Sequence, residues 1–263
     1  MNRPIVLLTD FGLRDHYVGT LKGVILSIHP KAVIIDLSHG IEPQNIAQAA
    51  ILLEAAYSFF PEGSIFVCVV DPGVGTKRKA LCVKTARHYF IGPDNGILSL
   101  ALNHSGKGMA IRSIENSKFF LKGVPSSTFH GRDIFSPAAA HLVRKNIFNQ
   151  IGPKISKIHS LNLPRIKKSK VKLEGEILYF DHFGNAITNI HKQDGSSEFW
   201  KKAKVWAKDI ELGKLRSTYG VGSQTLVAVL NSSSQLEIAM PGGSAREEAS
   251  LEVGDAITVI AAN

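Results

Sequence analysis

Residues 65–70, Ile-Phe-Val-Cys-Val-Val, constrain the fold most because they are continuously apolar and rich in β-branched side chains. Such a run is typical of a strand that is buried on both faces of a sheet. Asp71 follows directly, and the Pro-Gly-Val-Gly sequence at 72–75 predicts a turn, since it cannot continue the strand. The strand therefore carries a carboxylate at its carboxyl end, where open α/β sheets bind their ligands.

Arg78 lies seven residues after Asp71, near enough in sequence for a returning chain to bring the two side chains together. An Arg beside the carboxylate would keep it ionised and fix its orientation. The alternative is an Asp that caps the turn and an Arg that stays in solvent. This stretch by itself favours neither interpretation.

Strand-like and helix-like segments alternate through the first half of the chain. Strands are predicted at 4–9, 32–36 and 65–70, with Asp10 and Asp36 at the ends of the first two, and helices at 19–27 and 46–58. A strand pair at 80–84 and 89–91, a turn at 92–96 and a short helix at 97–102 follow. This order predicts an α/β domain whose sheet is mostly parallel and covered by helices.

His130 lies in the sequence Thr-Phe-His-Gly-Arg-Asp, directly before a helix predicted over 134–148. The free N–H groups at a helix N-terminus favour anions and disfavour further positive charge. A neutral imidazole at this place could accept a proton, although a His in such a loop is more often a cap or a surface residue.

Beyond residue 163 the long helical patterns give way to short alternating runs. These runs are 173–180, 186–190, 225–230, 235–240 and 256–260. They predict a second domain, a small β-barrel. We therefore expect an α/β domain over 1–163, a basic linker over 164–172 and the barrel over 173–263. The polar clusters at 181–185 and 231–234 have the composition of hairpin turns.

Composition excludes several classes of protein. No window is apolar for long enough to span a bilayer, and the N-terminal apolar run ends at Asp10 without a cleavage site, which predicts a cytoplasmic protein. Cys68 and Cys82 lie in apolar strand-like sequence and are expected to be buried free thiols. The formal charge is +9, but no zinc-finger spacing, aromatic-basic RNA motif or basic helix predicts a specific nucleic-acid partner.

A series of motifs runs through the chain in order. They are LLTDFG followed by DHYVG, then FFPEGSIFVCVVDPGVGTKR, IGPDNG, TFHGRDIF, YFDHFGNAITNI, NSSSQLEIA and GGSA. Together they resemble the S-adenosyl-L-methionine (SAM) hydroxide adenosyltransferases, a family related to fluorinases and chlorinases. The resemblance covers nearly the whole sequence.

The resemblance implies an N-terminal α/β domain, a C-terminal β-barrel and a homotrimer. Each active site would lie where the N-terminal domain of one subunit meets the C-terminal domain of its neighbour. The implied reaction is the hydrolysis of SAM to adenosine and L-methionine by an activated water that attacks C5′. Neither a cofactor nor a metal is implied, and SAM is the substrate.

The resemblance also implies roles for individual residues. The group that orients and deprotonates water falls on Asp71, Arg78 and His130. Asp10 would accept hydrogen bonds from the ribose hydroxyls, and Asp15, His16 and Tyr17 would line the nucleoside pocket. Asp181 and Ser232 would hold the methionine end, Phe183 and Asn185 would flank the substrate, and Ser244 and Ala245 would bind the adenine.

Two departures from the halogenase pattern favour the use of water. Fluorinases carry a Tyr where this chain has Asp71 and a halide-binding Ser where it has Gly131. An anionic Asp beside the nucleophile would repel a halide, and this repulsion is large in a dry site. A carboxylate can instead accept a hydrogen bond from water.

Three alternatives remain open on the sequence alone. The first is a SAM-dependent halogenase. The second is a protein that binds SAM, adenosine or nucleic acid without turnover, which the positive charge favours. The third is a metal-dependent phosphohydrolase that uses Asp10, Asp15, His16, Asp71 and His130.

Overall fold

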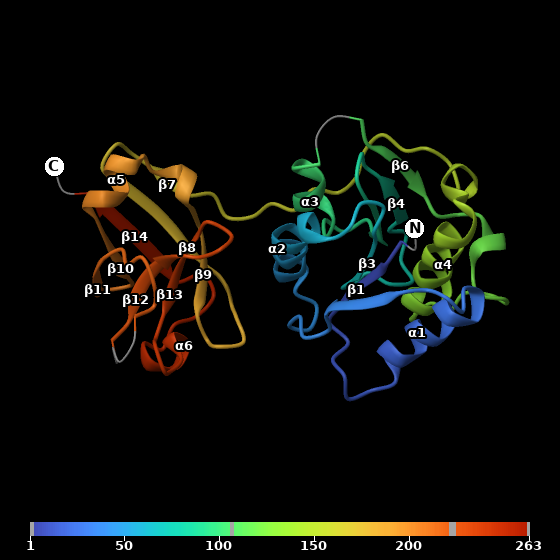
Figure 1. The fold of residues 1–263 in the computed structure, drawn as a ribbon, viewed down its shortest axis with the longest axis horizontal. Helices are drawn as coiled ribbons and strands as arrows, with labels where there is room; N and C mark the ends of the chain where they lie inside the picture. Colours follow the sequence, from blue (N-terminus) through green and yellow to red (C-terminus); the bar gives the residue numbers. More distant parts are fainter. Residues whose placement is uncertain (1–2, 106–107, 221–224, 262–263) are drawn as a thin grey trace. The chain divides into compact units, whose positions relative to one another are not determined.

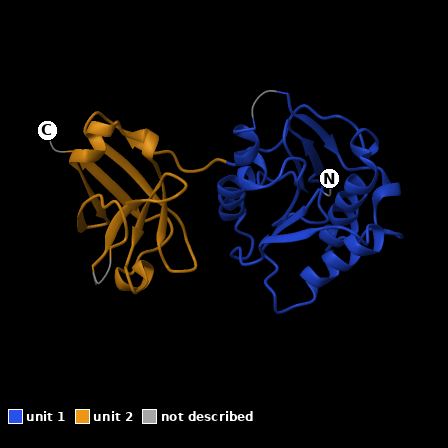
Figure 2. Ribbon diagram, viewed as in Figure 1, with its two compact units in different colours: residues 1–161 blue, residues 162–263 orange. Residues whose placement is uncertain are grey.

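The computed structural model describes residues 3–105, 108–220 and 225–261, and the chain divides into two compact units. Unit 1 is Met1–Leu161 and unit 2 is Asn162–Asn263 (Figure 2). Buried apolar residues form separate clusters in the two units, so each unit has a core of its own. None of the helices in the described ranges is long and apolar enough to cross a membrane.

Unit 1 contains a six-stranded sheet in the order β2-β1-β3-β5-β4-β6 (Figure 1). Its strands are β1 (Ile5–Thr9), β2 (Ile34–Ser38), β3 (Ile65–Val69), β4 (Ala80–Lys84), β5 (Tyr89–Pro93) and β6 (Ala110–Ser113). The pairs β1–β2, β1–β3 and β3–β5 are parallel, whereas β4 runs antiparallel to β5 and β6. The predicted mostly parallel sheet is therefore confirmed.

Helices cover both faces of this sheet (Figure 1). They are α1 (Tyr17–Ile28), α2 (Ile46–Ala56), α3 (Ser99–Asn103) and α4 (Ser136–Lys145). Alternate residues of β1 point to opposite faces, as a strand requires. Ile5 and Leu7 belong to the cluster that contains residues of α1 and α4, whereas Val6 and Leu8 belong to the cluster that contains residues of α2 and α3.

Short helical turns complete unit 1. The 3₁₀ turns are η1 (Tyr57–Phe59), η2 (Ser117–Phe119) and η4 (Ile147–Gln150), and η3 (Gly131–Phe135) is a π-helical segment. The helix predicted over 134–148 thus begins earlier, with η3, and its regular part is α4. Asp36 was expected at the end of its strand but lies within β2, because that strand continues to Ser38.

Unit 2 is an antiparallel sheet in the order β11-β10-β14-β8-β9-β13-β12, with β7 paired to β8. The strands are β7 (Lys167–Lys168), β8 (Lys172–Phe180), β9 (Ala186–His191), β10 (Ala203–Ala207), β11 (Ile210–Lys214), β12 (Val227–Leu230), β13 (Gln235–Ala239) and β14 (Ala256–Ala261). A bridge between Arg216 and Val229 links the two ends of the sheet. The sheet is therefore nearly closed, and the predicted small barrel is confirmed.

The remaining elements of unit 2 are the short helices α5 (Ser197–Lys202) and α6 (Ala245–Glu248) and the turn η5 (Lys192–Asp194). Strands β10 and β11 were not predicted from the sequence. The basic segment 164–172 includes β7, whose Lys167 and Lys168 pair with Glu174 and Leu173 of β8. Part of this segment therefore belongs to the sheet of unit 2.

Candidate functional site

The carboxyl end of β3 carries the first residue of the candidate site. Asp71 follows the fully buried Val70, and its own side chain is only 5% exposed. Val69 of β3 pairs with Thr9 of the parallel neighbour β1, so Asp10 leaves the sheet at the same edge as Asp71. The topology thus places at one edge of the sheet two carboxylates that lie 61 positions apart in the sequence.

Two tight turns return the chain after Asp71. Val74 donates its backbone N–H to the Asp71 carbonyl, and the Thr76 N–H and hydroxyl both bond to the Gly73 carbonyl. Gly75 has φ +77°, and an added Cβ there would overlap the Ser127 carbonyl oxygen. Only glycine fits this close approach, which packs the turn against the segment that leads to His130.

Arg78 bridges Asp71 and His130. Its Nε lies 3.0 Å from both carboxylate oxygens of Asp71, and its Nη2 donates to Oδ2 of the same carboxylate. The same Nη2 lies 2.7 Å from Nδ1 of His130. The Arg78 side chain is 9% exposed, and its guanidinium lies over the Phe135 ring at 5.4 Å. These three side chains, Asp71, Arg78 and His130, are called the Asp–Arg–His trio below.

The chemistry of arginine fixes the state of His130. A guanidinium has only donors, so Nδ1 of His130 accepts the hydrogen bond and the proton of the neutral ring lies on Nε2. Burial lowers the pKa of His130, and the charge of Arg78 lowers it further, against smaller opposing effects of Asp71 and Asp133. His130 therefore stays neutral at neutral pH and presents Nε2–H as a donor.

The carboxylate of Asp71 keeps the capacity to accept another hydrogen bond. Oδ2 accepts two bonds from Arg78, whereas Oδ1 accepts only one. Each carboxylate oxygen has about two lone pairs for hydrogen bonding. The trio thus offers an acceptor at Asp71 and a donor at His130, a combination suited to holding a water molecule.

Asp133 fixes the loop that carries His130. Its side chain is buried and accepts hydrogen bonds from the Ser126 N–H at 2.8 Å and from Arg132 Nε at 2.7 Å. Burial would raise the pKa of Asp133, but these two hydrogen bonds lower it overall. Because the carboxylate stays ionised, it ties both sides of the loop together across the position of His130.

An aromatic cluster adjoins the trio. The Tyr17 ring lies 5.7 Å from Phe11 and 5.4 Å from Phe129, the residue before His130. The Tyr17–Phe129 pair is edge-to-face, which is favourable at this distance, and the Phe11–Tyr17 pair is tilted. The cluster brings the DHYVG motif, with exposed Asp15, His16 and Tyr17, next to the trio.

Asp10 accepts the Gln44 N–H at 2.8 Å.

The polar turn between β8 and β9 is organised by Asp181. Its Oδ1 accepts the backbone N–H groups of Phe183 and Asn185, and its Oδ2 accepts the side-chain amide of Asn185, each at 2.9 Å. Asn185 is buried, whereas the Phe183 ring is 72% exposed. The turn therefore presents an aromatic ring to solvent beside a fixed carboxylate and amide.

Ser244 and Ala245 lie against this turn. Gly184 has no room for a side chain because Ser244 occupies that space, and Arg246 donates its N–H to the Gly184 carbonyl at 3.0 Å. Ser244 also caps α6 by accepting the Glu247 N–H. Ser232 lies elsewhere, exposed in the hairpin turn between β12 and β13.

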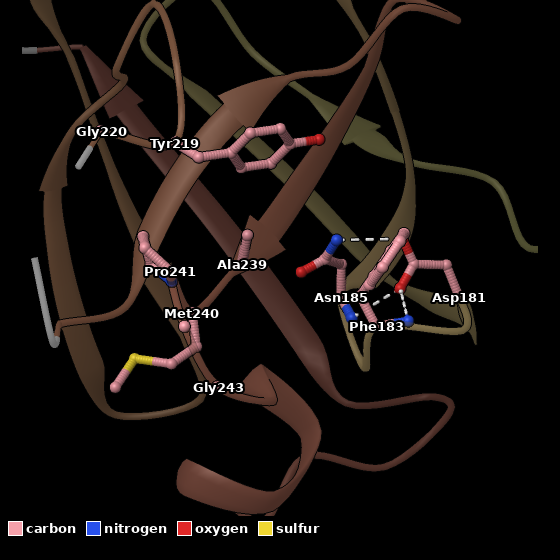
Figure 3. A pocket seen from close by; sticks show the side chains of 10 residues that line it. Asp181, Phe183, Asn185, Tyr219, Gly220, Ala239, Met240, Pro241 and Gly243 are labelled. Carbon is pink, nitrogen blue, oxygen red and sulfur yellow. Dashed lines mark hydrogen bonds between the residues drawn. The ribbon is translucent and has the colours of Figure 1, made fainter. Parts of the chain in front are cut away.

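A hollow of about 600 Å³ opens beside the Asp181 turn (Figure 3). It is lined by Asp181, Phe183, Asn185, Tyr219, Gly220, Ala239, Met240, Pro241, Gly242 and Gly243. We call it the unit 2 hollow. Three of the predicted residues therefore line one cavity, and neither Ser232, Ser244 nor Ala245 is part of its lining.

The sequence interpretation missed Tyr219 and Glu237. Tyr219 lines the unit 2 hollow and donates its hydroxyl to Glu237 Oε1 at 2.9 Å. Glu237 is 3% exposed, and burial raises its pKa. The sequence pattern could have indicated Glu237, because this charged residue interrupts the apolar run of β13. No sequence pattern indicates Tyr219, which lies in a loop.

Within residues 3–105, 108–220 and 225–261, no group of three or more His, Cys, Asp or Glu side chains is placed to hold a metal ion. Asp15 and His16 are both exposed on the loop before α1. Asp71 and His130 instead share Arg78 as their partner. A guanidinium between two potential ligands supplies positive charge at the position where a cation would otherwise lie.

Two models of one protein family match most of the chain. The model of the SAM hydroxide adenosyltransferase N-terminal domain matches residues 5–152, and that of the C-terminal domain of the same family matches residues 175–258. The chain belongs to this family. The two matches fall in unit 1 and unit 2 respectively.

Individual relatives match most of the chain. A protein of Thermus thermophilus named (R)-S-adenosyl-L-methionine hydrolase is 38% identical over 262 residues, which cover 96% of this chain and 97% of the relative. The crystal structure of an uncharacterized conserved protein from Thermotoga maritima is 38% identical, with a TM-score of 0.88 over 97% of this chain and 99% of that one. A fluorinase of an Actinoplanes species is 30% identical over 220 residues, 73% of each chain.

Proposed function

We propose that this chain hydrolyses SAM to adenosine and L-methionine. The family assignment and the relative named as a SAM hydrolase support this activity over halogenation. The observation that carries the proposal is the contact of Arg78 with both Asp71 and His130 at the carboxyl edge of the sheet. This arrangement has the donor and the acceptor that a reacting water needs.

The substrate itself determines what the site must supply. The sulfur of SAM is positively charged and leaves as a neutral thioether, so the leaving group requires no acid. The C5′–S bond breaks with both electrons going to sulfur, while a water oxygen forms the new bond to C5′ from the opposite side. The protein must therefore hold a water in line with the C–S bond and keep bulk water away.

Each member of the trio has a distinct task in this proposal. Asp71 accepts a water proton on Oδ1, the oxygen that Arg78 leaves with free capacity. His130 donates Nε2–H to the water oxygen and so orients a lone pair toward C5′. Arg78 holds both partners and balances the charge of Asp71. General-base catalysis of this kind typically contributes ~10²–10⁴-fold to the rate.

The remaining predicted residues would bind the substrate. Asp10 accepts hydrogen bonds from the ribose hydroxyls, and Asp15, His16 and Tyr17 line the nucleoside. In unit 2, Asp181 and Ser232 hold the methionine end, Phe183 and Asn185 flank the substrate, and Ser244 and Ala245 bind adenine. No cofactor and no metal takes part in this mechanism.

The direct test incubates purified protein with SAM and measures adenosine and methionine by chromatography. We expect both products in equal amounts, undiminished by a chelator, and a loss of about 10²-fold or more in kcat for Asp71→Asn. Formation of 5′-chloro-5′-deoxyadenosine in chloride would favour a halogenase. Activity that is lost on chelation would favour a metal-dependent phosphohydrolase, and tight binding without product would favour a binding protein.

The proposal includes a cytoplasmic homotrimer in which one subunit supplies the trio and a neighbour supplies the residues of unit 2. Both cysteines are free and buried, as is common in reducing compartments. Mixing an Asp71→Asn variant with an Asp181→Ala variant, after dissociation and reassembly, tests the shared site. Recovered activity supports the arrangement, whereas no recovery in mixed trimers would contradict it.

A further inference from the structure

The loop that carries Asp71 and Arg78 is held at both of its ends by the IGPDNG motif. Residues 91–96 of this motif run from the last residues of β5 into the turn before α3. At the start of the loop, Asn95 Nδ2 donates to the Val70 carbonyl at 2.8 Å. At its end, the Asp94 N–H donates to the Lys79 carbonyl at 2.9 Å.

The bond from Asn95 replaces sheet pairing at the point where that pairing ends. β3 pairs with β5 only as far as Val67, and with β1 only as far as Val69. The next residue, Val70, is completely buried, and a buried carbonyl without a partner is costly. Asn95 thus satisfies the carbonyl of the peptide that leads directly into Asp71.

Asn95 is itself fixed in place. Its Oδ1 accepts the Ile97 N–H at 3.2 Å, which closes the turn on the far side of the motif. The neighbouring Asp94 accepts the His159 N–H at 2.7 Å, and Gly96 packs against Leu161. The amide of Asn95 is therefore a rigid support and not a mobile surface group.

We propose that Asn95 is a positioning residue for the Asp–Arg–His trio, a role that rests on the proposed hydrolysis. Its side chain sets the direction in which the backbone leaves β3, and hence where the Asp71 carboxylate lies. Because Arg78 follows on the same loop and also contacts His130, a shift at Val70 reaches all three side chains. The residue does not contact the substrate and acts only through Asp71 and Arg78.

Asn116 provides a matched control. Its Nδ2 donates to the Gln150 carbonyl at 2.9 Å, and its Oδ1 accepts the Lys118 N–H at 3.2 Å, so it makes the same two bonds as Asn95. It lies between β6 and η2, outside the loop that carries Asp71 and Arg78. Substitutions at the two sites remove the same pair of hydrogen bonds, from the buried Val70 in one case and from the exposed Gln150 in the other, and only those at Asn95 should affect the reaction.

The experiment compares Asn95→Ala and Asn116→Ala in SAM hydrolysis. A displacement of about 1 Å can cost 10²-fold, so we expect kcat to fall about ten- to a hundredfold for Asn95→Ala, with KM within about twofold of wild type. Asn116→Ala should leave both constants within about twofold. Asn95→Asp, which keeps the acceptor for Ile97, replaces the Ala variant if the latter does not fold, with Asn116→Asp as its control.

Two further measurements separate positioning from a general structural effect. In an Asp71→Asn background, Asn95→Ala should lower kcat much less than in the wild type, because the Asp71 carboxylate that it positions is gone. In an NMR titration, Asn95→Ala should raise the pKa of His130, because Arg78 moves away, while Asn116→Ala leaves that pKa unchanged.

Full kcat in Asn95→Ala, or an equal loss in both backgrounds, would overturn the role of Asn95. A wild-type protein that forms no adenosine would instead refute the proposed function. The NMR titration distinguishes these failures because it needs no turnover. An unchanged His130 titration in Asn95→Ala would show that Asn95 does not position the trio.

Discussion

Removal of the Arg78 side chain should destabilise unit 1 far more than removal of an exposed cation. The Asp71 and Arg78 side chains are 5% and 9% exposed, so Arg78→Ala leaves a buried carboxylate without its ionic partner. Breaking such a pair costs about 3–5 kcal/mol. For a unit of this size, about 2–4 °C in Tm corresponds to 1 kcal/mol, which predicts a Tm lower by roughly 6–20 °C.

The assay is thermal and urea denaturation followed by far-UV circular dichroism, which reports mainly on helices α1, α2 and α4 of unit 1. Lys22→Ala is the control, because the Lys22–Asp36 pair is 35% and 38% exposed. Pairs as exposed as this contribute about 0–1 kcal/mol. The double variant Asp71→Asn/Arg78→Ala should recover much of the loss, since the unpaired charge is gone.

The cost assigned to an unpaired buried carboxylate would be refuted if Arg78→Ala lowered the unfolding free energy no more than Lys22→Ala. It would also be refuted if the double variant were as unstable as the sum of the single variants. The first result would mean that solvent reaches Asp71 freely. The second would mean that the loss comes from packing of the Arg78 side chain on Phe135 and not from the isolated charge.

Gly75→Ala should lower both the unfolding free energy and kcat. The control Gly213→Ala, where φ is +78° and the surrounding space is open, should lose only the roughly 1–2 kcal/mol of unfolding free energy that a left-handed backbone costs. Thermal denaturation and SAM hydrolysis measure the two effects. Burial lowers the pKa of His88, so unfolding takes up protons below about pH 6.5. The unfolding free energy should therefore fall as the pH decreases below about 6.5, and it should fall less steeply in His88→Phe than in the wild type. Protonation of His130 at Nδ1 would remove the acceptor for Arg78 and so disrupt the trio. Burial and Arg78 lower the pKa of His130, so the acid limb of kcat/KM should lie below pH 6.5, and in Arg78→Gln the NMR titration of His130 should move to higher pH.

Local chemistry explains why the fold could be predicted from the sequence. Continuous apolar runs such as that of β3, with helical patterns between them, require a buried parallel sheet covered by helices. The alternating runs after residue 163 indicated the barrel in the same way. Strands β10 and β11 were missed because β10 starts directly after α5, and because β11 carries exposed residues at most positions.

The sequence by itself determined that a carboxylate ends a buried strand, that a Pro-Gly turn follows it, and that His130 precedes a helix. Only the tertiary structure decided that Arg78 contacts both Asp71 and His130, since His130 is 52 positions from Arg78 and no local pattern encodes such a distance. The tertiary structure also decided that Asn95 donates to the Val70 carbonyl and that Tyr219 lines the unit 2 hollow. Backbone propensities and periodicity act over a few residues, whereas these contacts depend on which strand ends and loops the sheet order brings together.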